Sequence, residues 1–413
     1  MTVFSLSNPT PFEAGLADAM RALPHDQAER QAAFARFART GMPHRRLEAW
    51  KWTDMRVALS EPLTTDGSAI TAPSAFQGAG FFTITFDETG AHWAGEVPAG
   101  VTLRVTDEVS RLMPLAADEP MAALAQALTT ETLVISVADH AAVHAPVHLF
   151  RTGLGGDTHR RVLISLGQGA NLTLMDSLET SGAQSFFDNL LVECRLAPGA
   201  HLTRLGYSRA GACGVDNALY TVEADTDAVF EQYVLARGGK RSRLETRLHF
   251  QGSGAQATLL GVSMLGGRLH GDLTTHIIHD APECMVEQRH KSVLKDQANG
   301  VFQGKFLVER AGQKADANMQ ANALLLSEGA TINHKPELEI YADDVQCAHG
   351  STAGALDDEA LFYLRQRGLT AQMARALLVE AFLGEVFDAV PVDAVADFFR
   401  SEMTGWLAVE TKA

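Results

Sequence analysis

The strongest limit on the fold of this chain comes from a short pattern that recurs in its central part. The pattern is glycine or aspartate, then alanine, any residue and an apolar residue. It begins at Gly169, Gly199, Asp227 and Gly254, at spacings of 30, 28 and 27 residues, and a further copy begins at Gly329, 75 residues later. Periods of roughly 20–50 residues are typical of solenoids, because each unit buries its apolar face only against its neighbours. Since short strand-like segments lie between these turns, the sequence predicts a β-helix.

The residues before the repeats change from a helical to a strand-like pattern. Residues 10–58 are expected to be helical, with Asp26 as an N-cap and an apolar stripe of Ala33, Phe34, Phe37 and Ala38. From about residue 80 the apolar period becomes two, because Phe82, Ile84 and Phe86 alternate with threonines. This change predicts that strands begin there.

Helical patterns return after Gly354. Asp357 and Thr370 are suited to cap two helices, the second with apolar residues at Ala374, Leu378, Phe382 and Val386. A last helix is expected around residues 392–406. The expected fold class is mainly β, a solenoid core flanked by helical regions: a helical region over 1–75, a β-helix core over 76–354 and a C-terminal helical domain over 355–413.

Charge and composition argue against several classes of protein. Fifty acidic and thirty-four basic side chains give a formal net charge of −16, so nucleic acid and anionic membranes are poor partners. The N-terminus lacks the basic and apolar regions of a secretory signal, and no apolar run is long enough to span a bilayer. The four cysteines lie far apart in the sequence, which argues against a disulfide framework. We therefore expect a cytoplasmic protein.

Two groups of residues are candidate metal ligands, and the sequence supports the second group better than the first. The histidines at positions 270, 276, 279 and 290 are expected to be packed or solvated, because His276 and His279 point to opposite faces of a strand. Cys347 and His349 instead lie two residues apart and share a strand face, so they can supply two ligands to iron, zinc or copper. From the pattern alone, a small buried cysteine is the favoured interpretation, and a metal ligand is the alternative. No P-loop motif for ATP occurs in the chain.

Between Leu265 and Arg367 the sequence resembles the SufB/SufD family of iron–sulfur cluster assembly proteins. A shorter segment, RRLEAWKWT at residues 45–53, is similar to the family's N-terminal signature, with Trp52 where a tyrosine is more usual. The main resemblance is carried by four segments, LGGRLHGDLTTHIIHDAP at 265–282, KSVLKDQANGVFQGKF at 291–306, KPELEIYADDVQCAHG at 335–350 and DEALFYLRQRGL at 358–369.

The resemblance implies a right-handed parallel β-helix that pairs with a SufB-like subunit and a C-terminal helical region that docks SufC, an ABC-type ATPase. The Cys-x-His-Gly ending at residues 347–350 and the modest length favour the SufD paralogue. By that motif His349 is implied to lie at the SufB interface and to be required for function. Cys347 joins it as a candidate ligand for iron or a nascent cluster.

The expected function is therefore that of a scaffold and not of an enzyme. A cluster is usually held by about four thiolates, and four dispersed cysteines offer one or two ligands at most. We expect no stably bound cofactor in the chain alone, a cluster that forms transiently at the interface, and a homodimer as an option when SufB is absent. The alternatives are a SufB-type paralogue, a β-helix carbohydrate-active enzyme, and a self-contained metal-binding protein that uses Cys347, His349 and the histidines before residue 291.

Overall fold

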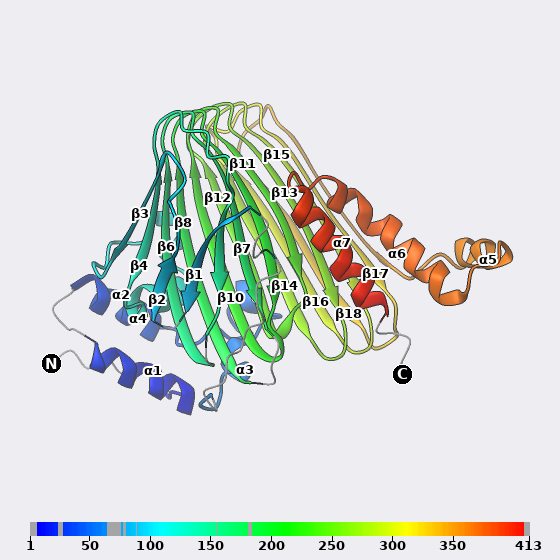
Figure 1. The fold of residues 1–413 in the computed structure, drawn as a ribbon, viewed down its shortest axis with the longest axis horizontal. Coiled ribbons are helices and arrows are strands. Elements are labelled where there is room, and N and C mark those ends of the chain that lie inside the picture. Colours follow the sequence, from blue (N-terminus) through cyan, green and yellow to red (C-terminus); the bar gives the residue numbers. More distant parts are fainter. Residues whose placement is uncertain are drawn as a thin grey trace.

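The computed structural model describes residues 6–23, 28–63, 76, 80–87, 89–153, 155–180 and 184–408, and the expected N-cap Asp26 lies outside them. A long stack of strands forms the body of the molecule, with helices against it near both ends (Figure 1). The helices are α1 (Pro11–Ala22), α2 (Ala28–Ala38), α3 (Met55–Ala58), α4 (Pro120–Leu128), α5 (Asp358–Gln366), α6 (Ala371–Asp388) and α7 (Asp393–Ala408), with the 3-10 helices η1 (Glu48–Trp50) and η2 (Pro114–Ala116).

The strands are arranged in two sheets that the chain visits alternately. The ten-stranded sheet has the order β19-β17-β15-β13-β11-β9-β7-β5-β1-β2, and the nine-stranded sheet has the order β18-β16-β14-β12-β10-β8-β6-β4-β3. Their bounds are β1 (Phe82–Asp87), β2 (Gly90–Trp93), β3 (Val101–Thr106), β4 (Thr132–Val137), β5 (Val147–Arg151), β6 (Gly156–Leu166), β7 (Asn171–Glu179), β8 (Phe186–Leu196), β9 (His201–Arg209), β10 (Gly211–Ala224), β11 (Val229–Ala236), β12 (Gly239–Phe250), β13 (Gln256–Leu265), β14 (His270–His279), β15 (Met285–Leu294), β16 (Asn299–Val308), β17 (Asp316–Leu325), β18 (Thr331–Ile340) and β19 (Gln346–Gly354).

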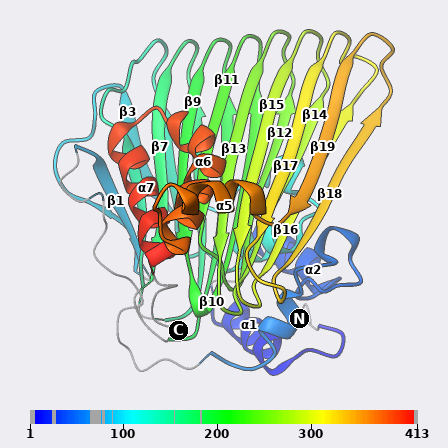
Figure 2. The same ribbon diagram turned by 90° about the vertical axis from the view of Figure 1, so that its right-hand side faces the viewer.

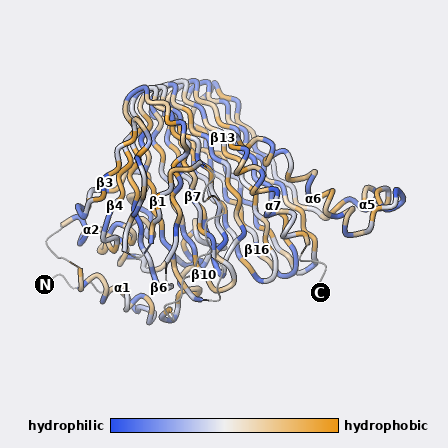
Figure 3. The backbone as a smooth tube through the Cα atoms, viewed as in Figure 1, coloured by the Kyte–Doolittle hydropathy of each residue, from blue (hydrophilic) through white to orange (hydrophobic). Residues whose placement is uncertain are grey.

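This alternation makes each pair of consecutive strands one coil of a parallel solenoid, and about eight coils are stacked (Figure 2). From β5 onward every strand pairs in parallel with the strand two places away in sequence, as β11 does with β9 and β13. Hydrophobic and hydrophilic residues alternate along many of the strands (Figure 3). Buried apolar residues from both sheets form one cluster between them. The predicted mainly β solenoid with flanking helices is confirmed.

The turns predicted at four of the recurring positions are present, each directly before a strand. Gly169, Gly199, Asp227 and Gly254 have φ angles of 60°, 67°, 54° and 71°, in the left-handed region that favours glycine and tolerates aspartate. The alanine after each of them is completely buried. Each repeat therefore pairs a left-handed turn with a small side chain that fits under the next coil.

The prediction that Gly329 begins a further copy of this turn is wrong. Gly329 leads into β18 of the nine-stranded sheet, whereas the other four copies lead into strands of the ten-stranded sheet. The equivalent later turns begin at Glu283 and Lys314, with φ angles of 61° and 59°, followed by buried Cys284 and Ala315. Gly329 is needed for a different reason, because a Cβ there would lie 2.6 Å from the carbonyl oxygen of Asp296 in the coil below.

The N-terminal helices cover the outer face of the nine-stranded sheet. Ala33, Phe34 and Phe37 of α2 are completely buried, as the apolar stripe predicts, while Ala38 is only partly buried. Helix α4 lies in the same apolar cluster, inserted among the early strands, and the sequence reasoning missed it. Every residue from Met121 to Leu128 is buried, so this helix has no polar face to reveal its period.

The C-terminal helices begin at the predicted caps. The Asp357 side chain accepts from the backbone N–H groups of Glu359 and Ala360, and the Thr370 side chain accepts from that of Met373. Helices α6 and α7 pack on the outer face of the ten-stranded sheet, whereas α5 has no buried residue and projects from the body (Figure 1). Within the described residues, no helix is long and apolar enough to cross a membrane.

Candidate functional site

The last coil of the solenoid leaves both sheets with an open edge. Strands β18 and β19 stand at the ends of their sheets, so one edge of each has no neighbouring strand among the described residues. Most of β19 is exposed, and no residue of β18 is fully buried. Such edges present rows of backbone N–H and C=O groups that can pair with another chain.

Cys347 and His349 lie on β19 and share its inward-directed positions. They pair with Ala317 and Met319 of β17, two residues buried in the solenoid core. Cys347 is half-buried and packs against that core, whereas His349 is exposed at the open end. The prediction that these two side chains share one face of a strand is confirmed.

The Cys347 thiol is not activated by its surroundings. Burial, followed by the negative charge of Asp316, raises the pKa of this thiol above its usual value of 9.0. Near neutral pH it is therefore protonated, and it can bind iron as a thiolate only when the metal ion displaces this proton or a base removes it.

A third inward-directed residue, His334, completes the open end and was missed from the sequence. It lies on β18, pairs with Phe302 of β16 and has a buried Nε2 without a hydrogen-bond partner among the described residues. Burial lowers its pKa. The spacing rule used for Cys347 and His349 also places His334 on the same strand face as Leu338, which packs on the core. The described residues contain no group of three or more His, Cys, Asp or Glu arranged to hold a metal ion.

The histidines between residues 270 and 290 are packed within the fold. His279 points into the solenoid and lies between Phe250 and Phe306, with ring centroids 4.9 and 6.3 Å away, while His276 faces outward. His290 is buried beside Phe302, and burial lowers its pKa to about 3. The expectation that His276 and His279 lie on opposite strand faces is confirmed.

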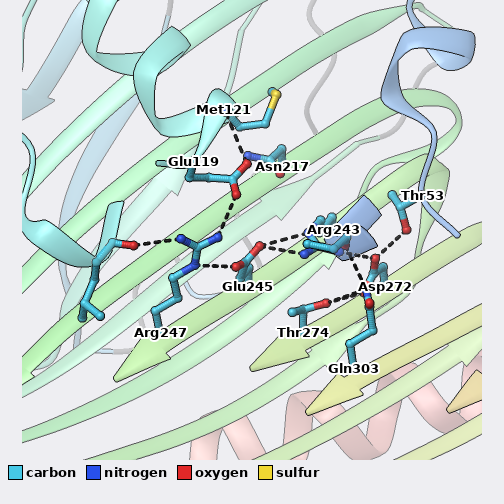
Figure 4. Close-up of polar contacts among 12 residues, drawn as sticks. Thr53, Glu119, Met121, Asn217, Arg243, Glu245, Arg247, Asp272, Thr274 and Gln303 are labelled. Carbon is cyan, nitrogen blue, oxygen red and sulfur yellow. Dashed lines mark hydrogen bonds and ion pairs between the residues drawn. The ribbon is translucent and has the colours of Figure 1, made fainter. Parts of the chain in front are cut away.

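A buried network of charges fastens the N-terminal region to the outer face of the nine-stranded sheet (Figure 4). Arg243 is completely buried and donates to Asp272 at 2.6 Å and to Glu245 at 2.8 Å. Glu245 also accepts from Arg247 at 2.6 Å, and Arg247 donates to Glu119 at 2.7 Å. Burial acts to raise the pKa of Glu245, but the two arginines outweigh it and lower this pKa to about 2.

The segment at residues 45–53 supplies the other side of this network. The ring of Trp50 lies 4.3 Å from the Arg243 guanidinium, and the Thr53 hydroxyl donates to Asp272 and lies 2.9 Å from His270 Nε2. Gln303 donates to the carbonyl of Ala49 at 3.2 Å. These contacts give the N-terminal signature segment a structural role, because they hold it against strands that lie about two hundred residues or more away in sequence.

The free surface of α5 and the start of α6 form a second candidate interaction site. Phe362, Tyr363, Met373 and Leu377 are 65%, 57%, 55% and 45% exposed, and all four lie within sixteen residues of the chain. Large apolar side chains that gather on a projecting helical element are typical of a protein-binding surface.

Comparisons with known proteins agree with this architecture. The family model described as the SUF system FeS cluster assembly SufBD core domain matches residues 150–382, more than half of the chain. A SufBD family iron–sulfur cluster assembly protein of Synechocystis is 26% identical over 408 residues, covering 90% of this chain and 89% of the relative. The iron–sulfur cluster assembly protein SufD of Escherichia coli is 26% identical over 371 residues, covering 85% and 86%. A SufBD family protein of Mycobacterium tuberculosis is 28% identical over 396 residues, covering 93% and 94%. The parallel solenoid fills most of the matched region, and the relatives align along nearly their whole length. This chain therefore belongs to the SufBD family of iron–sulfur cluster assembly proteins.

Proposed function

We propose that this chain is a non-enzymatic, SufD-type scaffold subunit that pairs with a SufB-like subunit and docks a SufC-like ATPase in the cytoplasm. One observation carries the proposal: His349, an exposed imidazole, stands at the end of a solenoid whose two strand edges are both unpaired among the described residues. A partner solenoid that adds strands to β18 and β19 would cover these edges and enclose His349 at the junction.

In this proposal the cluster is cargo and the chain contributes ligands to it. His349 supplies an imidazole, and Cys347 supplies a second ligand if metal binding displaces its proton. The remaining ligands come from the SufB-like subunit, because the other three cysteines are far away in the sequence and two of them, Cys194 and Cys284, are buried in the core. The same open edges allow two copies of this chain to pair when the SufB-like subunit is absent.

The test of this site is reconstitution of clusters on the three-component complex with His349→Ala. The imidazole is exposed, so its removal should change the free energy of unfolding by no more than about 0.5 kcal/mol while the cluster yield falls sharply. His144→Ala, which removes another exposed histidine in a loop before β5, is the matched control and should assemble clusters normally. A normal cluster yield from an intact His349→Ala complex would remove His349 from the mechanism.

The docking of the ATPase is assigned to α5 and α6. These helices carry the exposed apolar surface of Phe362, Tyr363, Met373 and Leu377, and the chain has no P-loop of its own. In the proposed cycle, ATP-driven closure of two SufC-like subunits pulls on the helical regions of both scaffold subunits. A packed solenoid deforms little and would pass this movement to the interface at His349.

The docking test uses point substitutions, because removing the C-terminal helices would uncover the apolar outer face of the ten-stranded sheet. Phe362→Glu with Tyr363→Glu should abolish ATPase binding and leave the SufB-like partner attached, as measured by co-purification. Met285→Glu changes an apolar side chain of similar exposure, 48%, on the solenoid and serves as the control. ATPase binding that survives the double substitution would disprove the assignment, and ATP turnover by the chain alone would disprove its non-enzymatic role.

A further inference from the structure

A basic hollow lies on the outer side of the N-terminal signature segment. It encloses about 600 Å³ and is lined by five cationic side chains and one carboxylate, together with a histidine, a tryptophan and a valine. The lining residues are His44, Arg45, Arg46, Lys51, Trp52, Asp54, Arg56, Val57 and Arg241. The net charge of this hollow is positive, whereas the whole chain carries a net charge of −16. We call this feature the basic hollow.

The floor of the basic hollow is held rigidly by the buried network of Figure 4. Trp50 and Thr53 point toward the sheet, where they contact Arg243 and Asp272. The residues between them, Lys51 and Trp52, are therefore turned outward, with the Lys51 ammonium 5.0 Å from the centre of the Trp52 ring. The hollow is thus formed before any ligand binds, which reduces the entropy lost on binding.

Two of the five cations of the hollow are available to a ligand, whereas Arg56 is ion-paired with Glu13 at 3.5 Å and donates to the Asn8 carbonyl. The guanidinium groups of Arg45 and Arg46 are exposed and make no ion pair with any described residue. The single carboxylate, Asp54, is engaged locally, because it accepts hydrogen bonds from the backbone N–H groups of Arg45 and Val57. Arg241 has a buried Nε without a partner among the described residues. An anionic ligand would therefore find the guanidinium groups of Arg45 and Arg46 beside the Lys51 ammonium, none of which has an ion-pair partner among the described residues.

The form of the hollow favours a protein segment over a small phosphate compound. Phosphate sites typically use backbone N–H groups at the start of a helix, but α3 has only four residues and the Asp54 carboxylate occupies its N-terminus. Val57 is 65% exposed and Trp52 partly exposed beside the cations. Flexible cations around exposed apolar side chains suit carboxylates and an apolar side chain on one extended segment.

We propose that the basic hollow is a docking site for an acidic segment of a partner protein, one that carries several carboxylates and at least one apolar side chain. The carboxylates pair with Arg45, Arg46 and Lys51, and the apolar side chain packs on Trp52 and Val57. The lining of the hollow includes no residue of β18, β19 or α5, so this contact is distinct from the contacts proposed above.

The test measures fluorescence anisotropy of a dye-labelled peptide, DELDELDE, with the full-length protein at about 0.15 M salt, where the Debye length is about 8 Å. Saturable binding is expected, and Arg45→Glu with Arg46→Glu should weaken it at least about tenfold, because two attractions become repulsions. Arg104→Glu with Arg310→Glu makes the same charge change at two exposed arginines outside the hollow and should leave the affinity within about twofold. Equal affinity of the two double variants, or no saturable binding, would overturn the proposal.

Two further arms separate the occupants. Trp52→Ala should weaken binding of DELDELDE but not of DENDENDE, in which asparagine replaces leucine; unchanged binding of both peptides would exclude the apolar contact and with it the proposal. Inorganic phosphate and ATP are added as competitors and should not displace the peptide at concentrations near its own. Displacement by either compound at such concentrations would identify a phosphate site and overturn the assignment to a protein segment.

Discussion

Replacing Arg243 by methionine is the most direct test of the buried network that fastens the N-terminal region. Methionine has a similar length and no charge, so the substitution removes the cation while it keeps much of the packing against Trp50. Glu245 retains its ion pair with Arg247 at 2.6 Å. Asp272 retains hydrogen bonds from Thr53 and Thr274 but is left without a cation in a fully buried position.

The expected cost follows from this imbalance. Removing one partner of a buried ion pair costs about 3–5 kcal/mol, since the other charge stays desolvated. At 1.36 kcal/mol for each factor of ten, local detachment of the segment should become about 10²- to 10⁴-fold more frequent. Adding Asp272→Asn to Arg243→Met removes the stranded charge and should recover part of the loss.

Amide hydrogen exchange of residues 47–59, followed by mass spectrometry, reads this detachment directly. Arg195→Met is the control, because it breaks an ion pair with Glu223 whose arginine is 68% exposed, and it should cost less than about 1 kcal/mol. Exchange of residues 47–59 that stays within about threefold of the native rate in Arg243→Met would refute the anchoring role of the network. No recovery in the double variant would refute the assignment of the cost to Asp272.

Three further predictions concern the core, the candidate thiol and the turns. Burial lowers the pKa of His279 to about 4, below its usual 6.5, so the stability that its neutral form contributes is lost as the pH falls from about 6.5 toward 4. In denaturant titrations at decreasing pH, His279→Phe should therefore gain stability relative to the native protein within that window. Parallel stability profiles of the two proteins would contradict this prediction. Since burial raises the pKa of Cys347, iodoacetamide should alkylate it more slowly at pH 7 than an unperturbed free thiol, and an equal rate measured by mass spectrometry would show that the thiol is accessible and unshifted. Gly252→Ala would place a Cβ 1.9 Å from the backbone nitrogen of Thr226 and should lower the melting temperature. Gly384→Ala in α6 would meet no atom within 4 Å and should raise the stability by up to about 1 kcal/mol. The reverse order of melting temperatures would contradict the stacking of the coils.

Much of the architecture could be predicted because it depends on residues that are close together in the sequence. The left-handed turns at Gly169 and Gly254 need residues that tolerate positive φ, and the caps at Asp357 and Thr370 need side-chain acceptors, so both leave signals within a few residues. Motif segments identified the family for the same reason. Helix α4 left no such signal, because it is buried on all sides, and Gly329 was misplaced because both corners of a coil select small residues.

The candidate site was predictable only as far as strand geometry reaches. Period two places Cys347 and His349 on one face, but the sequence does not say which face points inward or that the solenoid ends there. Only the stacking of β19 on β17 and the absence of a following coil in the described chain decide that His349 is exposed while Cys347 is half-buried. The same holds for His334, which reaches the open end from the other sheet.

The amino-acid sequence by itself therefore determined the repeat, the class of fold and the family, since these depend on residues close together along the chain. Tertiary structure alone decided which charges meet. Arg243 and Trp50, or Arg241 and Arg45, are separated by about two hundred residues, and no local periodicity relates them. Their proximity arises because the N-terminal segment packs across coils formed much later in the chain, so the anchoring network and the basic hollow exist only in the folded protein.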